Sequence, residues 1–191
     1  MTEENASAKI NTEKQKESKA VEGTVGPEDV KQLLKKAGET DNYEDKSRLY
    51  DKALTLDPLY LDAWIQKGFA LDRMGKSREA LDCYDKALEI DPENIGVKCL
   101  KGFAFNNLRE FEKSIESYDE VLKINPKDVF SLYQKGSALE NLGRYGEAMQ
   151  CYDKALDIDP TDVLIREKKL RLLKIIYKKG TLTDSPDSGF N

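Results

Sequence analysis

The chain has 191 residues, of which 35% are charged and 39% are hydrophobic, and its formal net charge at pH 7 is −5. It contains no histidine, so it lacks the commonest general acid–base residue and the commonest metal ligand, and its acidic balance disfavours general binding to nucleic acid. No apolar run approaches the roughly 18 residues of a membrane-spanning helix, so we expect neither a membrane nor a nucleic acid as a partner.

Residues 1–26 are rich in Glu, Lys, Ser, Thr and Ala, and their only large aliphatic residues are Ile10, Val21 and Val25. Such a segment buries too little apolar surface to offset the entropy that ordering costs, so we expect a disordered amino-terminal arm. No apolar secretory segment follows Met1.

Three cysteines, Cys83, Cys99 and Cys151, form no CxxC pair and are odd in number. Cys83 and Cys151 lie 68 residues apart in equivalent positions of a repeat, where they are expected to be small buried apolar residues. A disulfide framework is not expected, and the cysteines favour a reducing compartment. We therefore expect a cytoplasmic protein.

Four Asp-Pro or Asn-Pro steps follow one another at a constant spacing of 34 residues. They are Asp57-Pro58, Asp91-Pro92, Asn125-Pro126 and Asp159-Pro160. A near-identical pentad, YDKAL three times and YDEVL once, precedes each step in the same register. A period of this size is typical of one supersecondary unit that is copied and stacked. The units align without gaps as residues 27–60, 61–94, 95–128 and 129–162.

Each unit carries the pattern of a helical hairpin. Gly68, Gly102 and Gly136 share one column of the repeat. Glycine inside a helix costs about 1 kcal/mol relative to alanine, so its recurrence indicates close approach of a second helix. Turns are expected around Gly75-Lys76, Leu108-Arg109 and Gly143-Arg144. Asn94, Asp128 and Asp162 stand where they would cap the helices that follow.

These columns resemble the tetratricopeptide repeat. Unit two matches most fully, with Trp64, Gly68, Ala80, Tyr84 and Pro92 in the family's positions. The resemblance implies an all-α fold, a right-handed superhelical α-solenoid of helix-turn-helix hairpins whose first helices line a concave groove. Unit one matches only in its second half, which makes residues 27–60 a divergent first repeat.

Residues 163–179 are expected to form a carboxy-terminal capping helix, and residues 180–191 a disordered tail, with Gly180 ending the helix. Leu164, Ile165, Leu170, Leu173 and either Ile176 or Tyr177 are expected to face unit four. The helix carries seven basic residues and one acidic residue. This bias has two interpretations: a solubilising outer face, or a basic amphipathic helix that contacts an acidic partner, a nucleic acid or an anionic membrane.

The register of the resemblance implies which side chains face the groove. They are Ile65, Phe69, Arg73, Cys99, Phe103, Asn106, Asn107, Phe130, Tyr133 and Asn141. The apolar and aromatic members would form a strip suited to binding, and asparagine can pair with both the N–H and the C=O of a bound backbone. Phe103 and Tyr133 are expected to be the most exposed, whereas Ile65 and Phe69 could instead pack between hairpins.

The leading hypothesis is a non-catalytic protein–protein interaction module that binds a peptide or a helix of a partner protein. The alternative is a structural protein that assembles with itself through a terminal repeat or through the groove. An enzyme is not expected, because the chain shows no phosphate-binding glycine loop, nucleophile elbow or metal-ligand cluster, and no cofactor is expected.

One subset of the family binds the acidic carboxy-terminal tails of chaperones through a clamp of Lys, Asn and Arg. The clamp columns here hold Lys31 and Lys35, followed by Gln66, Gly96 and Leu100. Only the two lysines match, so we do not expect a chaperone-tail clamp.

Overall fold

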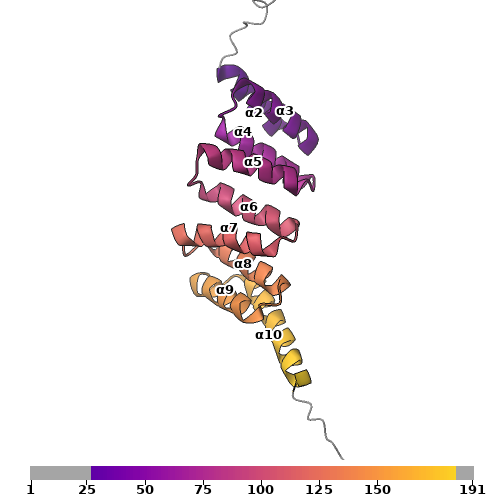
Figure 1. Cartoon of the computed structure of the whole chain (residues 1–191), viewed down its shortest axis with the longest axis vertical. Coiled ribbons are helices and arrows are strands. Elements are labelled where there is room, and N and C mark those ends of the chain that lie inside the picture. The colour runs from indigo at the N-terminus through magenta and orange to yellow at the C-terminus, as the bar shows by residue number, and fades with distance from the viewer. Residues whose placement is uncertain (1–26, 184–191) are drawn as a thin grey trace, which may run out of the picture.

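The computed structural model describes residues 27–183, so the predicted arm (1–26) and most of the predicted tail (184–191) lie outside the described residues. Within this range the chain is all-α, and its helices follow one another down the long axis of the molecule (Figure 1). They are α2 (Pro27–Glu39), α3 (Tyr43–Leu56), α4 (Leu61–Arg73), α5 (Ser77–Ile90), α6 (Ile95–Asn107), α7 (Phe111–Ile124), α8 (Val129–Asn141), α9 (Tyr145–Ile158) and α10 (Val163–Thr183).

The helices pair into hairpins that stack in chain order, as the resemblance predicts. The first helix of each pair has 13 residues and the second has 14. First helices begin at residues 27, 61, 95, 129 and 163, so the 34-residue spacing of the sequence is the spacing of the helices. Each helix packs against the next one along the chain, which is the arrangement of an α-solenoid.

The turns within the hairpins lie where the sequence predicts them. Gly75 and Gly143 have φ angles of 76° and 75°, and Arg109 takes the same left-handed conformation at 61°. Glycine adopts this conformation without the steric penalty that a Cβ atom brings, so the turn of unit three carries backbone strain that the turns of units two and four avoid.

A seam of glycine and tyrosine closes each complete hairpin. A Cβ atom on Gly68 would lie 2.5 Å from Cε1 of Tyr84, and one on Gly102 would lie 2.8 Å from Cζ of Tyr118. Gly136 meets Tyr152 in the same way, and all three tyrosines are fully buried. The predicted reason for the glycine column is therefore confirmed. We call these three Gly–Tyr pairs the seam.

An ionic ladder joins each unit to the next. In every rung a partly buried lysine of a first helix pairs with an aspartate of the preceding second helix. The rungs are Lys67–Asp51 at 2.6 Å, Lys101–Asp85 at 2.6 Å, Lys135–Asp119, and Lys169–Asp153 at 2.5 Å. Exposed ion pairs contribute little individually, but a repeated rung favours one register between neighbouring hairpins.

The last helix differs from its prediction in length and in orientation. It continues through Gly180 to Thr183, so Gly180 does not end it. Its buried apolar residues are Ile165 and Leu172. The other residues that were expected to face unit four are exposed: Leu164, Leu170, Leu173, Ile176 and Tyr177. The stack contacts only a narrow stripe of α10, because the helix docks through one side against α9.

None of the helices between residues 27 and 183 combines the length and the apolar content that crossing a membrane requires.

Candidate binding groove

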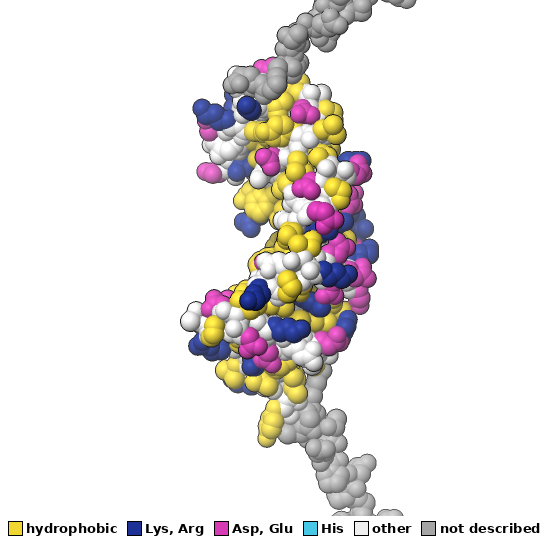
Figure 2. Space-filling view, turned by 90° about the vertical axis from the view of Figure 1, so that its left-hand side faces the viewer, with side chains coloured by type: hydrophobic (Ala, Val, Ile, Leu, Met, Phe, Trp, Pro, Cys, Tyr) yellow, Lys and Arg dark blue, Asp and Glu magenta, His cyan; other side chains and the backbone are white. Residues whose placement is uncertain are grey.

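Neighbouring first helices approach one another directly, α4 with α6 and α6 with α8. We call the surface that they share the groove. In the space-filling view the stack is hollowed at mid-height along its left edge, and hydrophobic and basic side chains gather there (Figure 2).

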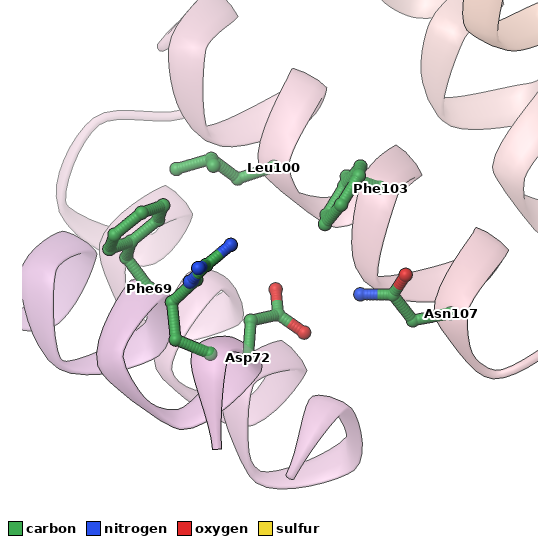
Figure 3. A pocket seen from close by; sticks show the side chains of 6 residues that line it. Phe69, Asp72, Leu100, Phe103 and Asn107 are labelled. Carbon is green, nitrogen blue, oxygen red and sulfur yellow. The ribbon is translucent and has the colours of Figure 1, made fainter. Parts of the chain in front are cut away.

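A pocket of about 320 Å³ opens between α4 and α6. Phe69 and Asp72 of α4 face Leu100, Phe103 and Asn107 of α6 across it (Figure 3). Arg73 lines the same pocket. The structure thus brings together Phe69, Arg73, Phe103 and Asn107, all predicted from the sequence, and Asp72 and Leu100 line the pocket beside them.

Three aromatic side chains of the groove remain accessible to solvent. Phe69 is 43% exposed, Phe103 is 38% exposed and Phe130 is 50% exposed. The ring of Phe130 packs edge-on against Tyr118, with ring centroids 6.4 Å apart. Phenylalanine at this exposure leaves a large apolar area in water, which the fold itself does not require.

Two predicted groove residues are half-buried, which for Ile65 is the alternative that the sequence left open. Tyr133, expected to be among the most exposed, is half-buried against the core and tilts over Tyr152 at a centroid distance of 6.2 Å. Burial raises the pKa of its phenol. Ile65 is also half-buried and packs against the core of units two and three. Both residues support the groove from beneath more than they line it.

The polar predictions also have different environments. Asn107 is exposed and faces the pocket, whereas Asn141 is exposed but donates from Nδ2 to the backbone O of Ser137 at 2.8 Å. Asn106 is half-buried, and its Oδ1 has no hydrogen-bond partner within the described part of the chain. Among the predicted asparagines, Asn107 therefore has the placement that a backbone clamp requires.

Cys99 lies between α6 and α8, with its Sγ 3.4 Å from Oγ of Ser131. It is half-buried, and burial raises the pKa of its thiol. A raised pKa lowers the fraction of thiolate at a given pH, so the Cys99 thiol is less reactive than that of an exposed cysteine.

One end of the groove is basic and aromatic. The ring of Phe69 meets that of Tyr43 edge-on at 6.5 Å. Two cations lie over the same tyrosine ring: Nζ of Lys46 at 5.5 Å and Cζ of Arg73 at 5.6 Å from its centroid. Tyr43 and Lys46 were not predicted to lie here, because the groove register counts only first helices and both residues belong to the second helix α3.

Two carboxylates of the first helices accept hydrogen bonds from tyrosines of the seam. The hydroxyl of Tyr84 donates to Oδ2 of Asp72, and that of Tyr152 donates to Oε2 of Glu140, each at 3.1 Å. Arg171 of α10 also pairs with Glu140, which raises the pKa of the guanidinium. Asp72 and Glu140 are therefore held in place by hydrogen bonds within the fold.

The chain is similar to known repeat proteins. Two family models, both described as tetratricopeptide repeat, match it: one at residues 61–94 and 129–162, the other at residues 95–128. A comparison with curated proteins finds no match.

Among solved structures, MamA 41-end from Desulfovibrio magneticus RS-1 superposes with a TM-score of 0.70 at 18% identity, covering 86% of this chain and 100% of that one. The first tetratricopeptide domain of Spaghetti (RPAP3), bound to the HSP90 peptide SRMEEVD, gives 0.59 at 21% identity over 61% and 93%. The Arabidopsis OM64 tetratricopeptide domain gives 0.57 at 25% identity over 60% and 94%.

Proposed function

The chain belongs to the tetratricopeptide repeat family, and from this premise we propose that it is a non-catalytic protein–protein interaction module. It binds a peptide or an amphipathic helix of a partner protein in its groove. The observation that carries this proposal is the pocket between α4 and α6, in which Phe69 and Phe103 expose apolar surface beside Asn107.

The pocket is suited to one large apolar side chain of the partner. Its volume of about 320 Å³ is of the order of a small ligand site, and its walls are mainly apolar. Full burial of a leucine or phenylalanine side chain stabilises a complex by about 1.5–3 kcal/mol. Further exposed apolar surface at Phe130 would extend the contact along the groove toward α8.

Polar groups at the rim would orient the bound segment. Asn107 can pair with a backbone amide, and Arg73 and Lys46 supply positive charge at the end of the groove near Tyr43. A partner with an apolar anchor and an acidic residue toward α3 fits this arrangement, because charge complementarity orients a ligand more than it adds affinity.

The acidic chaperone tail is not the ligand that we propose. The domain of RPAP3 was solved with the HSP90 peptide SRMEEVD. Here Gln66, Gly96 and Leu100 occupy the columns that follow Lys31 and Lys35 in such a clamp, and Leu100 instead forms an apolar wall of the pocket. The second basic cluster of the clamp is missing.

A cytoplasmic location is part of the proposal. The thiols of Cys83, Cys99 and Cys151 are free, which suits a reducing compartment.

Selection of random peptides displayed on phage tests the groove directly. The full chain should enrich peptides that share an aromatic or aliphatic anchor, and Phe103→Glu should lose at least about tenfold in affinity for them, since a charge then occupies the apolar wall. Leu59→Glu is the matched control, because Leu59 is an exposed leucine in the loop between α3 and α4. Selected peptides that bind Phe103→Glu as tightly as the wild type would contradict the proposal.

A further inference from the structure

The helix α10 is built and docked like the first helix of a further repeat. It begins 34 residues after Val129, and the side chain of Asp162 caps it by accepting from the backbone N of Ile165 at 2.9 Å. The last rung of the ionic ladder, Lys169–Asp153, ties it to α9. Leu172 stands in the column of Ala70, Ala104 and Ala138 and is fully buried, as they are.

In the other repeats, the side of the first helix that faces away from the preceding repeat is covered by the second helix of its own hairpin. In α10 this side is not covered by another described helix. In α4 and α8, Leu71 and Leu139 are buried beneath the second helix of the hairpin. The equivalent residue of α10, Leu173, is 46% exposed. Leu170 and Tyr177 lie on the same side and are 54% and 76% exposed. We call Leu170, Leu173 and Tyr177 the outer stripe of α10. The helix lies at the end of the stack in Figure 1.

The positive charge of α10 favours a covering helix with a negative net charge. Residues 163–179 carry seven basic and one acidic side chain, a net charge of +6. The second helices α5 and α7 each carry two basic and four acidic residues, and α9 carries one and three, so each has a net charge of −2. A second copy of α10 would bring like charges together, whereas an acidic helix complements the charge of α10.

The shape of the outer stripe excludes the chain's own second helices as occupants. Leu170 stands in the column of Gly68, Gly102 and Gly136. At Gly68 even a Cβ atom would lie 2.5 Å from the ring of Tyr84. A helix that carries tyrosine at this position therefore clashes with Leu170, and α5, α7 and α9 all carry it.

We propose that the outer stripe of α10 is a docking site for an acidic amphipathic helix of a partner protein, with Ala, Gly or Ser where the chain's own second helices carry Tyr. The partner's helix occupies the place of a second helix in the hairpin. This site is separate from the groove, because the stripe and the groove are formed by different helices.

A designed peptide tests the site on the full chain. The probe has the sequence of α5 with Tyr84→Ala and Cys83→Ser, capped at both ends and stapled on its polar face so that it is helical when free. Fluorescence anisotropy should show saturable binding to the wild type. The same peptide with the tyrosine retained should bind at least about tenfold more weakly, because the ring meets Leu170.

Variants of the chain distinguish binding at the outer stripe from binding in the groove. Leu170→Gly should reverse the preference between the two peptides, since it restores the glycine of the seam. Leu173→Glu should weaken binding at least about tenfold, whereas Leu59→Glu and the groove variant Phe103→Glu should leave it unchanged. Loss of peptide binding in Phe103→Glu, or no preference between the peptides, would overturn the proposal.

Two other occupants are outcomes of the same set of variants. Flotation of the wild type with phosphatidylserine–phosphatidylcholine vesicles, abolished by Leu173→Glu, would replace the partner helix with an anionic membrane. A dimer in sedimentation equilibrium that Leu173→Glu dissociates would replace it with a second copy of the chain. The proposal predicts neither flotation nor a dimer.

Discussion

Gly68 and Phe69 are neighbours in the chain, but they belong to two regions with opposite properties. Gly68 lies in the seam, where the ring of Tyr84 leaves no space for a side chain, whereas Phe69 lies in the groove and is 43% exposed. Gly102 and Phe103 repeat the contrast one unit later. Successive residues of a helix point about 100° apart, so one can pack against the next helix while its neighbour faces the groove.

The two regions also differ in how closely the units agree. The seam has the same glycine and tyrosine in units two, three and four. The groove position next to the glycine holds Phe69, Phe103 and Ser137 in turn. Positions that hold the hairpins together repeat because packing allows few alternatives, and positions that face the groove differ because packing leaves them free.

The largest contrast should come from removing an aromatic ring from each region. Tyr84→Ala should reduce the free energy of unfolding by about 3–5 kcal/mol, because the ring is fully buried and its loss leaves a cavity. Phe69→Ala should cost less than about 1 kcal/mol, since much of this ring is already in water. Urea denaturation followed by circular dichroism measures both. Equal losses would remove the distinction between the regions.

The same substitution at two helical glycines should have effects of opposite sign. Gly68→Ala should destabilise the chain by about 1–3 kcal/mol, because the new Cβ atom overlaps the ring of Tyr84. Gly146→Ala in α9 should stabilise it by about 0.5–1 kcal/mol, since apart from its chain neighbours and the nearby backbone of α9 no atom lies within 4 Å of the added group, and alanine favours the helix. Thermal unfolding of the two variants measures the sign of each change in stability. Stabilisation by Gly68→Ala would show that the seam has room for a methyl group beside Tyr84.

Within the seam, the tyrosine hydroxyl should contribute more to the free energy of unfolding in unit two than in unit three. Tyr84→Phe removes a hydrogen bond to Asp72 and should cost about 1 kcal/mol. Tyr118→Phe should be neutral or slightly stabilising, because this buried hydroxyl finds no hydrogen-bond partner in the region spanning residues 27–183. Equilibrium denaturation of both variants tests the difference, which disappears if Tyr118→Phe costs as much as Tyr84→Phe.

The rate of thiol alkylation should differ between Cys83 beside the seam and Cys99 in the groove. Cys83 is buried beside the seam and burial raises its pKa from 9.0 to about 11, whereas Cys99 lies half-buried in the groove. At about pH 8 iodoacetamide should therefore alkylate Cys99 first, as peptide mass spectrometry can follow. The folded chain keeps the Cys83 proton where the unfolded chain has lost it, so the free energy of unfolding should fall as pH rises from about 9 to about 11. Faster alkylation of Cys83 would contradict this picture.

The sequence predicted the repeating part of the molecule well. The helix starts, the three turns and the contact of glycine with a second helix all follow from the 34-residue period. Each of these depends on local geometry that recurs, so agreement between units reveals it. The pocket residues Phe69, Arg73, Phe103 and Asn107 were predicted from the register of the family resemblance, which assigns these two columns of the first helices to the groove.

The remaining features depend on how helices of different units meet, which no single column encodes. Tyr133 was expected in the groove but turns toward Tyr152, and Tyr43 reaches the groove from a second helix. The predicted orientation of α10 was also wrong. Its sequence has apolar residues on two sides, and this pattern alone does not determine which side packs against the stack. The 34-residue register determines the side: Leu172 occupies the column of the buried alanines, and Leu170 and Leu173 then face outward.

The most direct test of the central claim is affinity capture from an extract of the native cell with the full chain, its groove variant Phe103→Glu and the control Leu59→Glu side by side. All three should keep the same helicity, because both substituted residues are exposed. The wild type and Leu59→Glu should retain a common partner that Phe103→Glu loses. Undiminished capture of that partner by Phe103→Glu would show that the groove is not where this protein binds.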